Sequence, residues 1–256
     1  MSRLECHQFP YNNDNYGVLL HDADTGQCAC VDAGDAQATM DALSTKGWRL
    51  SHLLITHHHG AHTAGLSAIK AETGCMVIGP EPASSSIAGI DTYVGDGSEF
   101  EFAGRSVRVI HTPGHTKDMV NYYFADDALV FTGDTLFSMG CGRLFEGDAA
   151  MMLASIRKLK ALPAETQVYC AHEYTATNAR FALDVDPDNS ALQARARQVT
   201  QLRSQGLPTV PSTLQMELDT NPFLRTDNAQ LRQSLSMPDA DEVAVFAELR
   251  ERRNQY

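Results

Sequence analysis

The chain has 256 residues, of which 43% are hydrophobic, so it can bury a large core in one domain or in one domain with an appendage. Its formal net charge of −12 argues against nucleic acid or an anionic membrane as the main partner, because both attract basic surfaces. The longest apolar runs fall far short of the roughly 20 residues that span a bilayer, and the first residues lack an apolar signal region. We therefore expect a soluble, cytoplasmic protein.

The first two thirds of the sequence predict short strands separated by turns, with helices between some of them. Expected strands cover residues 16–20, 28–31, 50–55, 76–79, 99–102, 105–110, 119–125, 128–132 and 167–170. Expected helices cover residues 35–47, 62–72 and 148–161. Asp24-Thr25-Gly26 indicates a hairpin between the first two of these strands.

Beyond about residue 173 the pattern becomes mainly helical, with helices expected at 174–183, 188–205 and 239–253. We therefore predict a mixed α/β catalytic domain over residues 1–172 and a small helical domain over residues 173–256. The six cysteines contain no CxxC pair. Without a secretion signal, they are interpreted as reduced, mostly buried thiols.

The stretch Thr56-His57-His58-His59-Gly60-Ala61-His62 directly follows the apolar run Leu53-Leu54-Ile55. His57 and His59 are two residues apart, so an extended segment points both imidazoles to the same side. His62 opens the next element, where a helix start can turn it back toward them. Such a run can also be a solvated loop, but its place after a buried strand favours three nitrogen ligands of a catalytic zinc ion.

Three further residues stand directly after apolar strands. His115 lies in a Pro-Gly turn, Asp134 follows Leu129–Gly133, and His172 follows Val168–Ala171. Buried histidines and carboxylates are costly unless they are paired or bound to a metal. The repeated placement therefore predicts one shared active-site rim.

With these motifs in place, the chain resembles the glyoxalase II (hydroxyacylglutathione hydrolase) family of the metallo-β-lactamase superfamily. The superfamily pattern His-x-His-x-Asp-His corresponds to residues 57–62, and further family features run over residues 133–137, 141–147 and 171–175. The family's C-terminal Arg-x-x-Lys-Asp-x-Phe corresponds to residues 250–256. The resemblance implies an αββα sandwich that carries a C-terminal helical, glutathione-binding domain.

The resemblance also implies the ligands of two metal ions. One ion takes two histidines of the first motif and a later histidine, which here are His57, His59 and His115. The second ion takes the motif's Asp and last His with a late His, and Asp134 bridges the two ions. The positions that correspond to this second set are Ala61, His62 and His172.

Glutathione recognition is implied for four residues: Arg143, Tyr174, Arg250 and Arg253. Two guanidiniums can hold a carboxylate in forked hydrogen bonds, and Arg in place of Lys at position 253 keeps the positive charge. An ordinary helix C-terminus would also favour cations at 250 and 253.

Two departures from the family pattern lie in the predicted site. Ala61 stands where a ligating Asp is expected, so we expect the second metal site to be weak or empty. Asp118-Met119 stand where the family continues with Gly-His. Asp118 is interpreted as a loop charge rather than as a replacement ligand.

The function implied is hydrolysis of S-(2-hydroxyacyl)glutathione, such as S-D-lactoylglutathione, by a metal-activated hydroxide, weakened by Ala61. Asp134, His57, His59 and His115 would act in catalysis, with one or two zinc ions, or iron or manganese, as the cofactor. Two alternatives remain open: a superfamily metallohydrolase or oxygenase with another substrate, and a glutathione-conjugate binding protein with little turnover. We expect a monomer.

Overall fold

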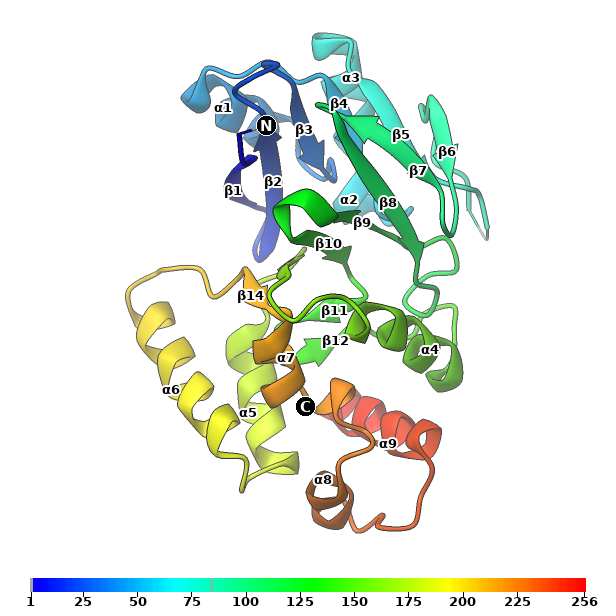
Figure 1. The fold of residues 1–256 in the computed structure, drawn as a ribbon, viewed down its shortest axis with the longest axis vertical. Coiled ribbons are helices and arrows are strands. Elements are labelled where there is room, and N and C mark those ends of the chain that lie inside the picture. The colour runs from blue at the N-terminus through cyan, green and yellow to red at the C-terminus, as the bar shows by residue number, and fades with distance from the viewer. Residues whose placement is uncertain (1, 84) are drawn as a thin grey trace. The chain divides into compact units, whose positions relative to one another are not determined.

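The computed structural model describes residues 2–83 and 85–256 (Figure 1). The chain forms two compact units, each with most of its residue contacts inside itself. Unit 1 comprises Met1–His111 and Thr116–Gly133, and unit 2 comprises Thr112–His115 and Asp134–Tyr256. The chain thus crosses from one unit to the other around residues 112–115 and again after Gly133. His115 belongs to unit 2, whereas the histidine motif at residues 57–62 belongs to unit 1.

The first sheet of unit 1 has six strands in the order β1-β2-β3-β4-β5-β6. The strands are β1 (Glu5–Tyr11), β2 (Asn15–His21), β3 (Cys28–Val31), β4 (His52–Leu54), β5 (Met76–Pro80) and β6 (Thr92–Val94). β1, β2 and β3 pair antiparallel, and β3 to β6 pair parallel. The carboxyl ends of β3 and β4 therefore lie side by side at one edge of the sheet.

Helices α1 (Ala36–Lys46) and α3 (Leu66–Thr73) share a hydrophobic core with this sheet. The Asp35 side chain caps α1 by accepting a hydrogen bond from the backbone of Ala38, and Gly47 ends the helix in the left-handed conformation. Leu53 and Ile55 are fully buried in this core. The segment that carries the histidine motif is thus fixed at its strand end.

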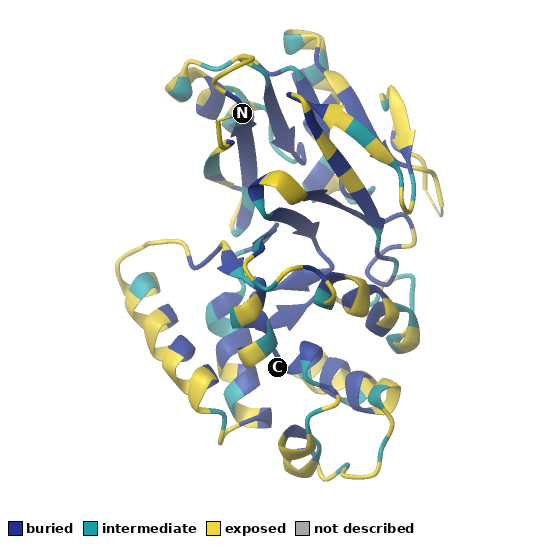
Figure 2. Ribbon diagram, in the orientation of Figure 1, coloured by how far each residue is buried: buried dark blue, intermediate teal, exposed yellow. Residues whose placement is uncertain are grey.

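The second group of strands in unit 1 is antiparallel: β7 (Glu99–Phe102), β8 (Arg105–His111), β9 (Val120–Phe124) and β10 (Leu129–Gly133). β9 and β10 are buried along their whole length (Figure 2). The hydroxyl of Tyr122 on β9 donates to the carbonyl of Ile55 at 2.6 Å. This bond ties the second group of strands to the end of β4, next to the histidine motif.

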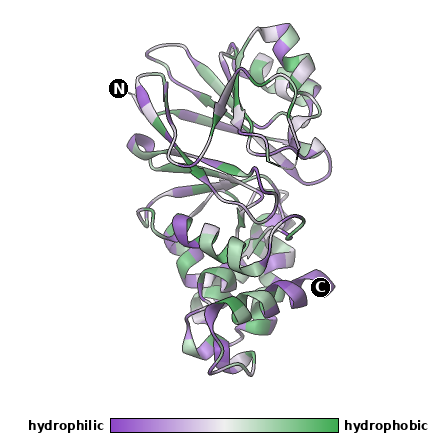
Figure 3. Cartoon of the chain, turned by 90° about the vertical axis from the view of Figure 1, so that its right-hand side faces the viewer, coloured by the Kyte–Doolittle hydropathy of each residue, from purple (hydrophilic) through white to green (hydrophobic). Residues whose placement is uncertain are grey.

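Unit 2 is mainly helical. Its helices are α4 (Ala149–Lys160), α5 (Thr175–Val185), α6 (Ser190–Ser204), α7 (Leu214–Thr220), α8 (Ala229–Ser234) and α9 (Glu242–Gln255). It also contains the hairpin of β11 (Leu136–Phe137) and β12 (Gly140–Cys141), and the pair β13 (Gln167–Cys170) and β14 (Ser212–Thr213). Figure 3 shows hydrophobic and hydrophilic residues on the same helices, as expected where only one face is buried.

The predicted α/β class with a helical C-terminal part is confirmed, and the Asp24-Thr25-Gly26 turn does join two antiparallel strands. The sequence analysis missed the strands Glu5–Tyr11 and Thr92–Val94 and the short helices Leu214–Thr220 and Ala229–Ser234. β1 was missed because its polar residues and Pro10 obscure the alternation. It is an edge strand, where proline is tolerated.

The cysteines also follow the prediction, since all six are free and five of them are buried. Across the described residues, none of the helices is both long and apolar enough to pass through a bilayer.

A buried ion-pair cluster in unit 1 gives a test of stability. Arg105 on β8 binds Asp127 at 2.6 Å and Asp22 at 3.0 Å, and all three side chains are almost fully buried. Arg105→Ala leaves both carboxylates buried without their cation, so we expect a loss of about 3–5 kcal/mol in the free energy of unfolding. Urea denaturation measures this loss.

The matched control is Arg108→Ala on the same strand, whose guanidinium lies over the Tyr123 ring at an exposed position. We expect it to change the free energy of unfolding by less than about 1 kcal/mol. Equal effects of the two substitutions would contradict the assignment of the buried cluster as a stabilising feature.

Candidate metal centre

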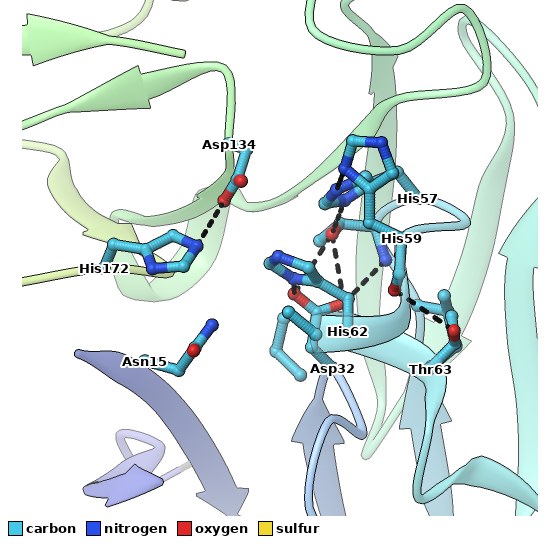
Figure 4. Close-up of polar contacts among 12 residues, drawn as sticks. Asn15, Asp32, His57, His59, His62, Thr63, Asp134 and His172 are labelled. Atoms are coloured by element: carbon cyan, nitrogen blue, oxygen red, sulfur yellow. Dashed lines mark hydrogen bonds and ion pairs between the residues drawn. The ribbon is translucent and has the colours of Figure 1, made fainter. Parts of the chain in front are cut away.

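The three histidines predicted as ligands in unit 1 lie together (Figure 4). His57 Nε2 is 3.1 Å from His59 Nδ1, and the rings of His57 and His62 have centroids 4.1 Å apart. His59 is extended, and α2 (Gly60–Thr63) begins directly after it, so the first helical turn brings His62 back toward the strand end. The local chain direction thus produces the convergence that the spacing predicted.

Asp32 orients this cluster, although the sequence analysis did not single it out. It is 3% exposed and accepts a hydrogen bond from His62 Nδ1 at 2.7 Å. It also accepts hydrogen bonds from the backbone and hydroxyl of Thr56, which precedes His57. A carboxylate on Nδ1 leaves Nε2 as the nitrogen that can bind a metal, which is the usual arrangement around metal-binding histidines.

A signal for Asp32 was present in the sequence. It directly follows the buried apolar strand Cys28–Val31, and this is the same placement that identified Asp134 and His172. A polar residue directly after an apolar strand therefore marks the orienting carboxylate as well as the predicted ligands.

The interpretation of Asp118 as a loop charge is wrong. Asp118 is only 2% exposed, and both of its carboxylate oxygens accept from His58 Nδ1 at 3.0 Å. Because a buried carboxylate needs a partner, this pairing fixes the middle histidine of the motif. The sequence did not reveal the pairing because the two residues are 60 positions apart.

Ala61 lies on α2, and its carbonyl accepts a hydrogen bond from the Tyr11 hydroxyl at 3.0 Å. Its methyl group cannot bind a metal. The backbone at this position is therefore anchored as part of the motif, while the carboxylate expected there is missing.

In unit 2, Asp134 lies between two histidines. Its Oδ2 is 3.3 Å from His115 Nε2, and its Oδ1 is 3.3 Å from His172 Nε2 (the His172 contact is drawn in Figure 4). All three side chains are more than 90% buried. A carboxylate that turns each oxygen toward a different imidazole nitrogen has the arrangement of a ligand that bridges two cations.

The loop of residues 142–147 holds His115 in place. His115 Nδ1 donates to the carbonyl of Arg143 at 2.8 Å, which again leaves Nε2 as the metal-binding nitrogen. The backbone of Phe145 donates to the His115 carbonyl, and that of Gly147 donates to the Gly114 carbonyl. A side chain at position 147 would meet Gly114 Cα at 2.7 Å, so this close approach requires glycine.

His172 is held by an aromatic cluster. The ring of Tyr174 stacks on it with a centroid distance of 4.7 Å and an angle of 7°, and Phe137 contacts both rings edge-on. Tyr174, predicted to bind glutathione, is thus a direct neighbour of a predicted metal ligand.

Three arginines predicted to bind substrate lie in unit 2, on the loop after β12 and on α9. Arg143 is exposed, Arg253 is half-buried, and Arg250 is only 4% exposed, with its Nη1 donating to the Cys141 carbonyl at 2.7 Å. Burial lowers the pKa of Arg253, and the neighbouring guanidiniums of Arg250 and Arg143 lower it further. This positive charge is therefore poorly neutralised and favours an anionic ligand.

Burial also raises the pKa of the Cys141 thiol, against the opposing effect of Arg250. Cys141 is therefore a neutral, buried thiol that supports Arg250 rather than a reactive nucleophile.

The donor sets of the two units fit divalent metal ions. Imidazole nitrogen with carboxylate oxygen suits zinc, iron and manganese, and no thiolate takes part. His62 and His115 each have a hydrogen-bond partner on Nδ1, which leaves Nε2 available to bind a metal. Asp134 turns one carboxylate oxygen toward each of two histidines, as a metal ligand could.

Comparison with known proteins identifies the superfamily and the fold. The family model "Metallo-beta-lactamase superfamily" matches residues 15–172, and "Hydroxyacylglutathione hydrolase C-terminus" matches residues 173–256. Among solved structures, ETHE1 from Myxococcus xanthus has a TM-score of 0.68 at 23% identity, covering 98% of this chain and 91% of that chain. The BLEG-1 B3 metallo-β-lactamase has a TM-score of 0.64 at 25% identity, covering 86% and 99% respectively. The molecule therefore has the metallo-β-lactamase fold, with a helical C-terminal part.

Curated relatives identify the family within this superfamily. Hydroxyacylglutathione hydrolases of Brucella ovis and Brucella abortus are each 50% identical over 254 residues, covering 99% of this chain and 99% of theirs. The chain belongs to the hydroxyacylglutathione hydrolase (glyoxalase II) family of the metallo-β-lactamase superfamily.

The orienting role of Asp32 can be tested with Asp32→Asn. The substitution removes the charge beside His62 and can present an amide donor to Nδ1. We expect zinc affinity to fall by about 10–100-fold, the usual cost of removing such a partner. Competition with a chromophoric chelator measures zinc affinity, and circular dichroism checks that the variant is folded.

The control is Asp35→Asn at the cap of α1, where asparagine caps as well as aspartate. It should leave zinc affinity unchanged. If Asp32→Asn binds zinc as tightly as the unaltered chain, Asp32 does not act through His62.

Proposed function

We propose that the chain hydrolyses the thioester S-(2-hydroxyacyl)glutathione, such as S-D-lactoylglutathione, to glutathione and a 2-hydroxy acid. The proposal rests on two groups of residues in unit 2 that flank the hairpin of β11 and β12. One group is Asp134 with its two histidines, and the other is the arginine cluster, which consists of Arg143, Arg250 and Arg253. The 50% identity to hydroxyacylglutathione hydrolases over nearly the whole chain supports the same substrate class.

The proposed metal ligands follow the family assignment. His57, His59 and His115 would hold one ion, and Asp134 would be shared with a second ion. The second ion would have only His62 and His172 besides Asp134, because the methyl side chain of Ala61 offers no ligand atom. A divalent ion held there would supply a water molecule of lowered pKa and would polarise the thioester carbonyl.

The chain's own residues then bind and orient the substrate. Arg143 and Arg253 hold the anionic glutathione through charge-assisted hydrogen bonds, and Arg250 fixes the hairpin backbone at Cys141 from the same side. Tyr174, stacked on His172, borders the thioester end of the substrate. With glutathione held in this way, the acyl carbon would lie at Asp134 and its two histidines. The oxygen of water would then bond to the acyl carbon as the C–S bond breaks, and the glutathione thiolate would leave.

Ala61 changes the charge balance of the proposed centre. Two divalent cations with two carboxylates and a hydroxide carry a net charge of about +1, whereas without the carboxylate at position 61 they carry about +2. The greater repulsion weakens the second ion most, because that ion has lost a direct ligand. We therefore propose one tightly held ion and reduced turnover.

Several finer assignments form part of the proposal. Zinc is the proposed metal, the protein acts as a monomer in the cytoplasm, and the domain boundary lies between residues 172 and 173. The boundary is supported by the two family models, which meet at that position.

The proposed reaction is tested by following S-D-lactoylglutathione hydrolysis at the thioester absorbance with zinc-loaded protein. We expect turnover by the unaltered chain and a loss of at least about 100-fold in Asp134→Ala, since even an indirect partner of a metal site contributes 10–100-fold. Absence of turnover, with hydrolysis of a lactone or β-lactam instead, would reject the substrate assignment.

The proposed effect of Ala61 is tested by metal content. After dialysis against a weak chelator, we expect about one zinc ion per unaltered chain and two per Ala61→Asp chain, because the new carboxylate restores a ligand and a negative charge. Ala61→Asp should also hydrolyse the thioester faster. Two tightly held ions in the unaltered chain would overturn this part of the proposal.

A further inference from the structure

Asn178 on α5 is a buried residue that connects the arginine cluster with the hairpin of β11 and β12. It is 3% exposed, and its Nδ2 donates to the Ser138 carbonyl at 3.0 Å, at the tip of the hairpin. Its Oδ1 accepts from Arg253 Nε at 3.1 Å. One amide group thus uses its donor on the hairpin and its acceptor on a predicted substrate-binding arginine.

The position of Asn178 is constrained on its other side. A side chain at position 140 would meet Asn178 Cγ at 2.7 Å, so only glycine leaves room for the amide. The backbone hydrogen bond from Asn178 to the Tyr174 carbonyl fixes the first turn of α5 beside the ring that stacks on His172. The amide therefore has little freedom to turn away from Arg253.

The contact with Asn178 uses one of the three donor nitrogens of Arg253 and leaves the other two. Among the described residues, the amide of Asn178 is the only group that accepts a hydrogen bond from this side chain. Because Nε is used, the two Nη groups remain as a planar fork whose direction is set by the Nε bond. Such a fork matches a carboxylate with two parallel hydrogen bonds.

Arginine and lysine differ in how their side chains could serve these two tasks. A lysine ammonium is a single charged point on a flexible stem, and its three N–H donors lie on one nitrogen and form no planar fork. Arginine at this position can be anchored through Nε and still offer two donors. A lysine at this position would keep the charge but would lack the planar pair of donors.

We propose that Asn178 is a positioning residue that orients Arg253 through its Nε and so presents the Nη fork to a carboxylate of the glutathione moiety. The inference rests on the proposed function, since it concerns the same substrate. Asn178 itself does not touch the substrate, so it affects substrate affinity only by orienting Arg253.

A double-mutant cycle separates this role from a structural one. The variants are Asn178→Ala, Arg253→Lys and the combination of both, assayed with S-D-lactoylglutathione. Asn178→Ala should raise KM about 10-fold with kcat changed less than about twofold, the size expected for losing one hydrogen bond to a charged group. In the Arg253→Lys background the same substitution should raise KM by less than about twofold, because lysine has no Nε to orient.

A structural role would give a different pattern. The bond from Asn178 to Ser138 is lost in both backgrounds, so an effect through the hairpin would lower kcat or the melting temperature equally whether position 253 carries arginine or lysine. Equal rises in KM in the two backgrounds, or no rise in either, would overturn the inference. Asn228→Ala is the control, since Asn228 caps α8 through the backbone of Leu231 and should leave KM unchanged.

Isothermal titration with free glutathione distinguishes failure of this inference from failure of the proposed function. Binding by the unaltered chain that weakens about 10-fold in Asn178→Ala, but not further when that change is added to Arg253→Lys, supports the inference even without turnover. Binding that is equal in all variants overturns the inference alone. If the unaltered chain neither binds glutathione nor hydrolyses the thioester, the proposed function fails and the inference fails with it.

Discussion

The arrangement of Asp134 is the constraint on which the rest of the site depends. A nearly buried carboxylate whose two oxygens face two different imidazole nitrogens is unfavourable without a cation, because neither histidine offers a permanent charge. The structure around it is built to keep that arrangement. The loop of residues 142–147 holds His115 from one side, and the Tyr174 and Phe137 rings hold His172 from the other.

A related principle governs His62 in unit 1 and His115 in unit 2, where the partner on Nδ1 determines which ring nitrogen can bind a metal. Asp32 gives His62 a negatively charged partner, whereas the carbonyl of Arg143 gives His115 a neutral one. A carboxylate partner makes an imidazole a stronger donor to a metal, so His62 is favoured as a ligand even though Ala61 beside it is not one. Asp32 contributes its negative charge only through His62, so it cannot replace the carboxylate ligand that is missing at position 61.

The sequence predicted most of the fold and the set of candidate ligands, because both follow from local rules. Strand ends presenting His or Asp can be recognised without knowing which strands are neighbours. The missed features depend on long-range partners: Asp118 was misjudged because His58 is distant in sequence, and Asn178 gave no signal because its partners are Ser138 and Arg253. A buried amide in a helix has no pattern of its own, and only its contacts identify it.

The hairpin of β11 and β12 connects a proposed metal ligand with the proposed substrate-binding arginines of unit 2. Asp134 precedes it, Arg143 follows it, and its backbone is held by Asn178, Arg250 and Asn221. The α5 and α9 helices and the turn after α7 thus hold the hairpin in position, and α9 also carries the proposed substrate-binding Arg253. Ala61 makes none of these contacts, so the charge missing at position 61 would weaken the proposed second ion and leave Arg143, Arg250 and Arg253 unchanged. Under the proposed function, binding of glutathione and retention of the second metal would therefore be separable.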